Sequence, residues 1–273
     1  MQDAAMWLVK IGLVLAVAYV AIVALMYATQ TQMMFPTWMA GSSGARLPAS
    51  AARLEIDTPD GERLHGVHLP PARARAGGRL VLLGFGGNAW NAYGLAAYLH
   101  ELFPEADIVA FHYRGYAPST GRPSAAALLA DAPLVHDHVV ETLGAGRVVA
   151  VGLSLGAGVA AHLAARRALA GLILVTPFDS VEALARDHYP WAPVRWLLRH
   201  RMSTLESLRG LATPTALIAA GRDTVVPPRR TEPVRRAIPT LVFDRTIARA
   251  DHNDLYHRPE FRAAMLEALA RLE

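Results

Sequence analysis

The longest apolar stretch of the chain lies near its amino terminus, where 18 uncharged residues run from Ile11 to Ala28. About 20 apolar residues let a helix cross a bilayer, and residues 4–9 extend the run beyond Lys10. The pattern therefore predicts a transmembrane anchor over residues 1–30. A cleaved signal peptide is the alternative, but it would have a shorter apolar region and a small residue in place of Tyr27. A buried core helix would show a polar face, which this stretch lacks.

The charges around this helix predict how it is oriented. Lys10 lies on the same side as the amino terminus, together with Asp3, and no charge follows the helix before Arg46. The positive-inside rule then favours the amino terminus in the cytoplasm and the main domain on the non-cytoplasmic side. We expect a single-pass membrane protein in which residues 31–51 form an interfacial segment and a Gly/Ser-rich linker.

The rest of the chain alternates between short apolar runs and amphipathic segments. Two alternating runs flank Thr58-Pro-Asp-Gly61 and predict a β-hairpin. The expected strands are 53–57, 63–69, 79–85, 107–112, 147–151, 172–175, 215–219 and 240–247. The expected helices are 93–102, 124–143, 157–167, 229–236 and 259–272, and an irregular lid segment is expected at about 178–211. This order predicts a single α/β domain over residues 52–273, with a mostly parallel sheet of about eight strands and helices on both faces.

Composition narrows the classes of function. Hydrophobic residues make up 53% of the chain and charged residues 18%, which indicates a folded domain rather than a disordered one. The net charge of +4 comes from dispersed arginines, since Lys10 is the only lysine, and this distribution disfavours nucleic-acid binding. The absence of cysteine excludes disulfides, Cys-ligated zinc and a cysteine nucleophile. His136 and His138 are two residues apart on a predicted helix, so they point to different faces and predict no metal site.

A Gly-x-Ser-x-Gly motif, Gly152-Leu-Ser-Leu-Gly156, joins the strand at 147–151 to the helix at 157–167. This strand–turn–helix arrangement is typical of a nucleophile elbow, in which the turn holds a serine in a strained backbone conformation. Glycine at both flanking positions avoids collisions with the neighbouring strand and helix. We therefore expect Ser154 to project from the turn, beside helix N–H groups that can face a developing oxyanion.

A serine nucleophile needs a base, and the base needs a carboxylate that orients it. The loops after the predicted strands supply Ser154, Asp223 and His252 in the order expected for a nucleophile elbow. Parallel strands end at one edge of a sheet, so we predict that these side chains form a catalytic triad there. Asp179 is the alternative acid, because it follows the strand after the elbow helix, and His257 is the nearest alternative base.

Together these motifs resemble the α/β-hydrolases, in particular the single-pass anchored serine hydrolases related to Bem-type and membrane-bound α/β-hydrolase-domain proteins. The resemblance extends from about residue 30 to the end, over the stretches 32–36, 86–91, 113–121, 152–156, 221–227 and 252–254. It implies an oxyanion hole made by the backbone N–H groups of Leu155 and Asn88. Relatives usually have histidine at the position of Gly86 and glycine at those of Trp90 and Ala117. These departures put the support of the loop in question, and Trp90 is expected to narrow the site.

The predicted function is that of a membrane-anchored serine hydrolase that cleaves carboxylic ester or thioester bonds. Tyr189, Trp191 and Trp196 in the lid segment favour small-molecule or lipid-like acyl substrates, although these side chains could instead pack on the sheet. The chemistry calls for no metal and no organic cofactor. The sequence predicts no particular oligomeric state.

Two other functions remain open from the sequence. An aminopeptidase-like hydrolase would need an acidic cluster to bind a free amine, and Asp179, Glu182 and Asp187 are the candidates. A non-catalytic interaction module is suggested by the altered loop around Gly86. Arg114 could be taken for a substrate clamp, but we expect it to tie its loop to a carboxylate on the next helix, such as Asp131.

Overall fold

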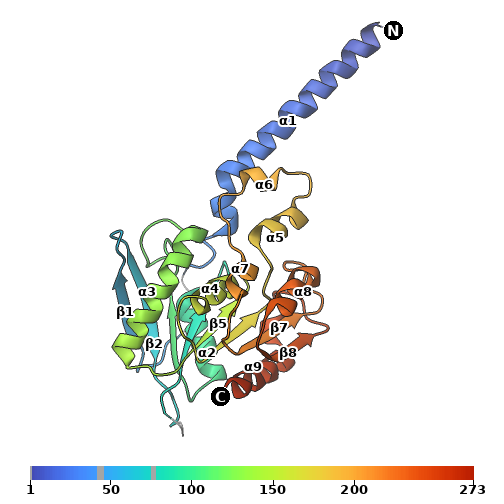
Figure 1. Ribbon diagram of the computed structural model, residues 1–273. Coiled ribbons are helices and arrows are strands. Elements are labelled where there is room, and N and C mark those ends of the chain that lie inside the picture. Colours follow the sequence, from blue (N-terminus) through green and yellow to red (C-terminus); the bar gives the residue numbers. More distant parts are fainter. Residues whose placement is uncertain (1, 42–45, 75–77) are drawn as a thin grey trace.

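The fold is described from a computed structural model that covers residues 2–41, 46–74 and 78–273, and it is built on one eight-stranded sheet (Figure 1). The strand order is β1-β2-β4-β3-β5-β6-β7-β8. β2 pairs antiparallel with β1 and β4, and every other neighbouring pair in this sheet is parallel. The predicted α/β-hydrolase fold with a mostly parallel sheet is confirmed. The strands are β1 Ala52–Asp57, β2 Arg63–Leu69, β3 Val81–Phe85, β4 Asp107–Phe111, β5 Val148–Leu153, β6 Gly171–Val175, β7 Thr215–Ala220 and β8 Leu241–Ile247.

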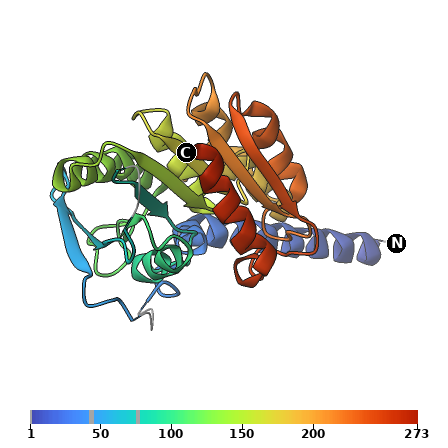
Figure 2. The ribbon, with the colours of Figure 1, turned by 90° about the horizontal axis from the view of Figure 1, so that it is seen from below.

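Helices cover both faces of the sheet, so the central strands are apolar on both sides. Along β5, Val148 and Ala150 pack on one face, whereas Val149 and Val151 pack on the other. The first face is covered by α3 (Ala125–Leu143), α4 (Leu155–Ala164) and α8 (Pro228–Ala237), and the second by α2 (Ala92–Leu102) and α9 (Pro259–Leu272). Figure 2 shows α9 lying across the sheet and α1 extending away from the domain.

The amino-terminal helix α1 (Gln2–Met34) is a single 33-residue helix with no buried residue. It contains the whole apolar run and continues beyond it to the edge of the domain (Figure 1). Phe35 follows directly and is 2% exposed in the core, whereas Trp38 is 77% exposed. Residues 42–45 of the predicted linker lie outside the described residues.

The lid segment is more regular than the sequence predicted. It contains three short helices, α5 (Val181–His188), α6 (Val194–Leu197) and α7 (Thr204–Leu208). Ser180 and Ser203 cap α5 and α7, where their hydroxyl groups accept hydrogen bonds from backbone N–H groups. These helices are too short to give a clear helical period in the sequence, which is why the expectation of an irregular stretch was wrong. Trp191 and Trp196 are 48% and 79% exposed, and the ring of Trp191 packs edge-on against Tyr19 of α1, with centroids 6.2 Å apart.

Candidate active site

The turn between β5 and α4 places Ser154 at the carboxyl edge of the sheet. Its backbone has φ 53° and ψ −113°, a conformation that residues with a side chain rarely adopt. Its N–H donates a 2.9 Å hydrogen bond to the carbonyl of Val175 at the end of β6. The sharp turn therefore holds the serine at the point where two central strands end, as the motif predicted.

The glycines of the motif are required by close approach of the backbone. A Cβ atom at Gly152 would lie 2.6 Å from the Cα of Ala157, inside the van der Waals distance. A Cβ atom at Gly156 would overlap the backbone carbonyl of Phe85 at the end of β3. Both contacts are with main-chain atoms, which cannot rotate away, so larger residues would force the turn open.

Ser154, His252 and Asp223 form a continuous chain of contacts. The Oγ of Ser154 lies 3.0 Å from Nε2 of His252, and Nδ1 of His252 lies 2.8 Å from Oδ2 of Asp223. The carboxylate can only accept, so Nδ1 carries the proton and Nε2 is left as an acceptor for the serine hydroxyl. The imidazole and the carboxylate are both buried. The structure thus brings together the three predicted side chains with the hydrogen-bond geometry of a nucleophile, base and orienting acid.

The acid and the base are fixed by their own loops. The second carboxylate oxygen of Asp223 accepts hydrogen bonds from the N–H groups of Val225 and Val226, at 2.9 and 2.6 Å. Asp251, next to the histidine, accepts a hydrogen bond from the N–H of Thr224, at 2.9 Å. This contact joins the loop after β7 to the loop after β8, so the two side chains keep a constant spacing.

The structure places neither alternative residue in contact with the serine or the imidazole. Asp179 binds Arg230 through a 2.9 Å ion pair, and its other oxygen accepts from the N–H of Ser180. His257 lies in a short 3₁₀ helix (Leu255–His257) and is exposed. Asp223 and His252 therefore fit the geometry of a triad better than their alternatives do.

The loop after β3 runs close to the nucleophile. A Cβ atom at Gly87 would lie 3.6 Å from the Cβ of Ser154, so the main chain at this glycine approaches the serine directly. Asn88 is exposed, and its carbonyl accepts a 2.7 Å hydrogen bond from the hydroxyl of Tyr116. Leu155 begins α4 on the other side of the serine. The sequence analysis missed the close approach of Gly87, although a glycine next to the predicted loop donor was a usable signal.

Gly86 and Trp90, where this loop departs from the sequence usual in relatives, are sterically complementary. The Cβ of Trp90 lies 2.8 Å from the position that a Cβ at Gly86 would take, so a side chain at residue 86 would collide with it. The indole ring packs edge-on against Tyr98 and Tyr256, with ring centroids 5.8 and 5.2 Å away. Trp90 therefore occupies the space that a histidine at position 86 would need, and it anchors the loop on neighbouring aromatic rings.

Two tyrosines hold the same loop from the other side. Tyr113 donates a 2.8 Å hydrogen bond to the carbonyl of Gly86, and Tyr116 binds the carbonyl of Asn88. Burial raises the pKa of both phenols above the ordinary value, so they stay protonated donors at neutral pH. The loop around Gly86 is thus supported in spite of its altered sequence.

Arg114, between these tyrosines, is tied to the structure rather than free for a substrate. Its guanidinium forms hydrogen bonds to both oxygens of Asp131, at 3.1 and 2.6 Å, and also binds Asp60. This bidentate pair, expected from the sequence, fixes the loop after β4 to α3. Within the described ranges, no group of three or more His, Asp or Glu side chains is arranged to hold a metal ion.

Comparisons with known proteins agree with this fold. The family described as alpha/beta hydrolase fold matches residues 80–196. An uncharacterized protein of Mycobacterium tuberculosis is 33% identical over 235 residues, which cover 84% of this chain and 81% of the relative. The lysophosphatidylserine lipase ABHD12 of Danio rerio is 30% identical over 138 residues, which cover 44% of this chain and 36% of the lipase.

Solved structures share the same fold. An esterase of Pyrococcus furiosus has a TM-score of 0.66 at 18% identity, over 84% of this chain and 97% of the esterase. A membrane phospholipase A described as a bacterial virulence factor has a TM-score of 0.63 at 16% identity, over 96% of this chain and 98% of the phospholipase. With its sheet order, its Gly-x-Ser-x-Gly elbow and these relatives, the chain belongs to the α/β-hydrolase fold family.

Proposed function

We propose that this protein is a membrane-anchored serine hydrolase that cleaves carboxylic ester or thioester bonds of apolar acyl substrates. The observation that carries the proposal is the chain of contacts from Ser154 through His252 to Asp223. A serine hydroxyl becomes a useful nucleophile only when a base can take its proton, and this site supplies both the base and its orienting acid.

In the proposed mechanism, Ser154 Oγ attacks the acyl carbon while Nε2 of His252 takes the hydroxyl proton. Asp223 stabilises the imidazolium that results. The N–H groups of Leu155 and Asn88 are the proposed donors to the tetrahedral oxyanion, and the N-terminal end of α4 adds a favourable dipole. His252 then returns the proton to the leaving alcohol or thiol, and water releases the acyl group from the serine by the same steps.

The proposed substrate class follows from the apolar side chains of the lid segment and from the relatives. The lid segment brings apolar side chains such as Leu184 and Leu197 to a groove beside α1. Lipid hydrolysis is the activity named for ABHD12 lipases, and the same fold is used by a membrane phospholipase. Both likenesses support an acyl ester of a lipid type as substrate.

The membrane anchor is proposed from α1. Within the described ranges, it is the helix long and apolar enough to cross a bilayer, and none of its residues is buried in the domain. Its carboxyl-terminal part makes specific contacts, since Gln30 donates a 3.1 Å hydrogen bond to the carbonyl of Leu197 and Thr31 lies 2.8 Å from the ring of His200. Tyr19 also contacts the lid segment, through a 3.0 Å hydrogen bond to the carbonyl of Trp191. Cleavage after residue 28 would remove the contact between Tyr19 and Trp191, which favours an uncleaved anchor over a signal peptide.

The acidic cluster offers little support for an aminopeptidase. Asp179 and Asp187 both bind Arg230, and Glu182 binds Arg186 and Arg201. Because arginines of the chain already neutralise these carboxylates, they are poorly suited to bind the free amine of a peptide.

A hydrolysis profile tests the proposal. The purified full-length protein would be assayed with acyl esters of graded length, acyl thioesters and aminoacyl amides, with Ser154→Ala as control. We expect turnover of esters or thioesters by the parent protein and a loss of at least about 10³-fold in Ser154→Ala. Cleavage of aminoacyl amides alone would contradict the proposed substrate class.

A further inference from the structure

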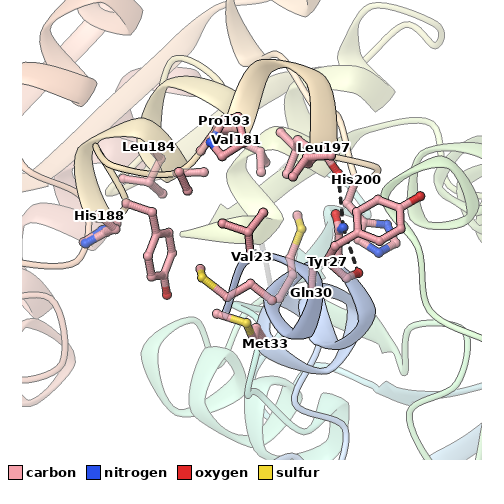
Figure 3. A pocket seen from close by; sticks show the side chains of 17 residues that line it. Val23, Tyr27, Gln30, Met33, Val181, Leu184, His188, Pro193, Leu197 and His200 are labelled. Carbon is pink, nitrogen blue, oxygen red and sulfur yellow. Dashed lines mark hydrogen bonds between the residues drawn. The ribbon is translucent and has the colours of Figure 1, made fainter. Parts of the chain in front are cut away.

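An apolar groove lies between α1 and the lid segment, apart from the contacts of Ser154. It encloses about 220 Å³. Figure 3 shows Val23 of α1 facing Val181 and Leu184 of α5 across this space, with Leu197 of α6 at its end. None of the described residues that line it is Asp, Glu, Lys or Arg. A narrow space with such a lining suits an uncharged hydrocarbon chain.

One wall of the groove is the helix that we propose to cross the membrane. The residues of α1 in the groove, such as Val23, Met26 and Gln30, are partly covered, whereas Leu25 on the opposite side is 63% exposed. The groove therefore opens onto the same apolar surface that lipid would cover. This continuity is the first reason to look for its occupant among lipids.

The position of the groove along the proposed membrane span gives a second reason to expect a lipid in it. Lys10 is costly to bury in hydrocarbon, so it marks one end of the span, and the 18 residues from Ile11 to Ala28 fill about 27 Å of the bilayer. The lid segment already contacts α1 at Tyr19, whose hydroxyl binds the carbonyl of Trp191. Residues 19–28 are thus beside the lid segment, and the tip of the lid segment must lie at membrane depth with them.

The side chains at the tip of the lid segment match such a position. Trp191 and Trp196 are exposed although they are large and apolar, as suits side chains that lipid would cover. Arg199 lies near the domain end of the helix, with its Cζ 4.4 Å from the centre of the Tyr27 ring. A cation at this level is well placed for the phosphate of a lipid headgroup.

We propose that the groove between α1 and the lid segment binds a hydrocarbon chain of a membrane lipid, which enters sideways from the bilayer. The proposal rests on the proposed function, because it assigns the acyl chain of the substrate to this groove. His188 connects the groove to the catalytic loops: it lines the groove, and its Nε2 lies 2.8 Å from the carbonyl of Val225 beside Asp223.

Photocrosslinking tests the occupant without using activity. Full-length Ser154→Ala would be placed in phosphatidylcholine vesicles that contain a phosphatidylcholine with a diazirine near the end of one acyl chain. We expect crosslinks on Leu184 and Leu197 of the lid segment. In the Val23→Trp background, which fills the groove, these crosslinks should fall at least fivefold, whereas Leu25→Trp on the opposite side of α1 should leave them unchanged. Crosslinks confined to the outward side of α1 would overturn the proposal.

Chain-length selectivity gives the matching test with the active protein. Val23→Trp should lower kcat/KM for a palmitoyl ester at least tenfold more than for an acetyl ester, and Leu25→Trp should keep the parent ratio. An equal loss for both esters would show that the groove does not hold the chain. If the parent protein cleaved no ester while the crosslinks on the lid segment were still found, the groove would stand as a lipid-binding site and the proposed hydrolase function would fail.

Discussion

The backbone of Ser154 is strained, and this strain should be measurable. A residue other than glycine in such a conformation costs about 1–3 kcal/mol, which the surrounding contacts must offset. Ser154→Gly relieves the strain, whereas Ser154→Ala keeps it. We expect the free energy of unfolding of Ser154→Gly to exceed that of Ser154→Ala by about 1 kcal/mol, while neither variant hydrolyses esters. Denaturant unfolding of both variants checks this, and equal stabilities would contradict it.

At the same scale, His112 should make the stability of the domain depend on pH. The side chain is 3% exposed after β4, and neither ring nitrogen has a hydrogen-bond partner among the described residues. Burial lowers its pKa from 6.5 to about 4, with a smaller effect from nearby His65. Between these two values the unfolded chain binds a proton that the folded protein does not. The contribution of neutral His112 to the free energy of unfolding is therefore complete above about pH 6.5, and it is lost as the pH falls toward 4.

The contribution of His112 can be isolated by substitution. His112→Phe keeps the ring that packs edge-on against Tyr93, 4.6 Å away, but it cannot be protonated. We expect the parent protein to lose up to about 3 kcal/mol more than His112→Phe between pH 7.5 and 4.5. Unfolding free energies of both proteins at the two pH values provide the test. Parallel pH profiles would show that His112 is not responsible.

The proposed triad could be predicted from the sequence because each of its residues follows a strand at the same edge of the sheet. Ser154 is marked by its flanking glycines, and Asp223 and His252 by the strand ends before them. The approach of Gly87 to the serine had a weaker signal, a glycine beside the predicted donor Asn88, because it depends on how the loop after β3 folds back in space.

At the scale of elements, the loop after β3 shows why single departures from a family pattern mislead. Gly86 and Trp90 each suggested a loss of support, but the structure places the Cβ of Trp90 within 2.8 Å of the position that a Cβ at residue 86 would take. Similarly, α5, α6 and α7 were not predicted, because they are too short for a long apolar period; serine caps stabilise α5 and α7.

A double-mutant cycle tests this compensation. Gly86→His alone should collide with Trp90, and Trp90→Gly alone should leave the loop without its aromatic anchor, so each should lower stability by about 1–3 kcal/mol. The double variant should lose less than the sum of the two, with a coupling energy of at least about 1 kcal/mol. Unfolding free energies and ester turnover of the four proteins give the measurement. Simple additivity would mean that the two positions are independent.

At the scale of the whole molecule, the sequence predicted an anchor, a linker and a domain as separate parts. In the structure, the end of α1 is continuous with the domain, because Phe35 is buried in the core and packs edge-on against His200 of the lid segment at 5.1 Å. This contact joins residues 165 positions apart, so no local pattern could reveal it. It places the lid segment beside the proposed membrane span.

The orientation of the whole molecule can be tested with a single cysteine, because the natural chain has none. Lys10 before the apolar run predicts the amino terminus in the cytoplasm. In spheroplasts of a bacterial host, a membrane-impermeant maleimide should label Glu105→Cys, and it should label Gln2→Cys only after lysis. The reverse pattern would place the domain in the cytoplasm.

The central claim is that Ser154 is an activated nucleophile, and active-site labelling tests it most directly. The full-length protein would be treated with a fluorophosphonate probe, and the labelled peptide would be identified by mass spectrometry. We predict a single label on Ser154, no label on Ser154→Ala, and labelling of His252→Ala that is slower by about 10²-fold or more. If Ser154→Ala were labelled as strongly as the parent protein, the nucleophile would lie elsewhere and the proposed mechanism would be wrong.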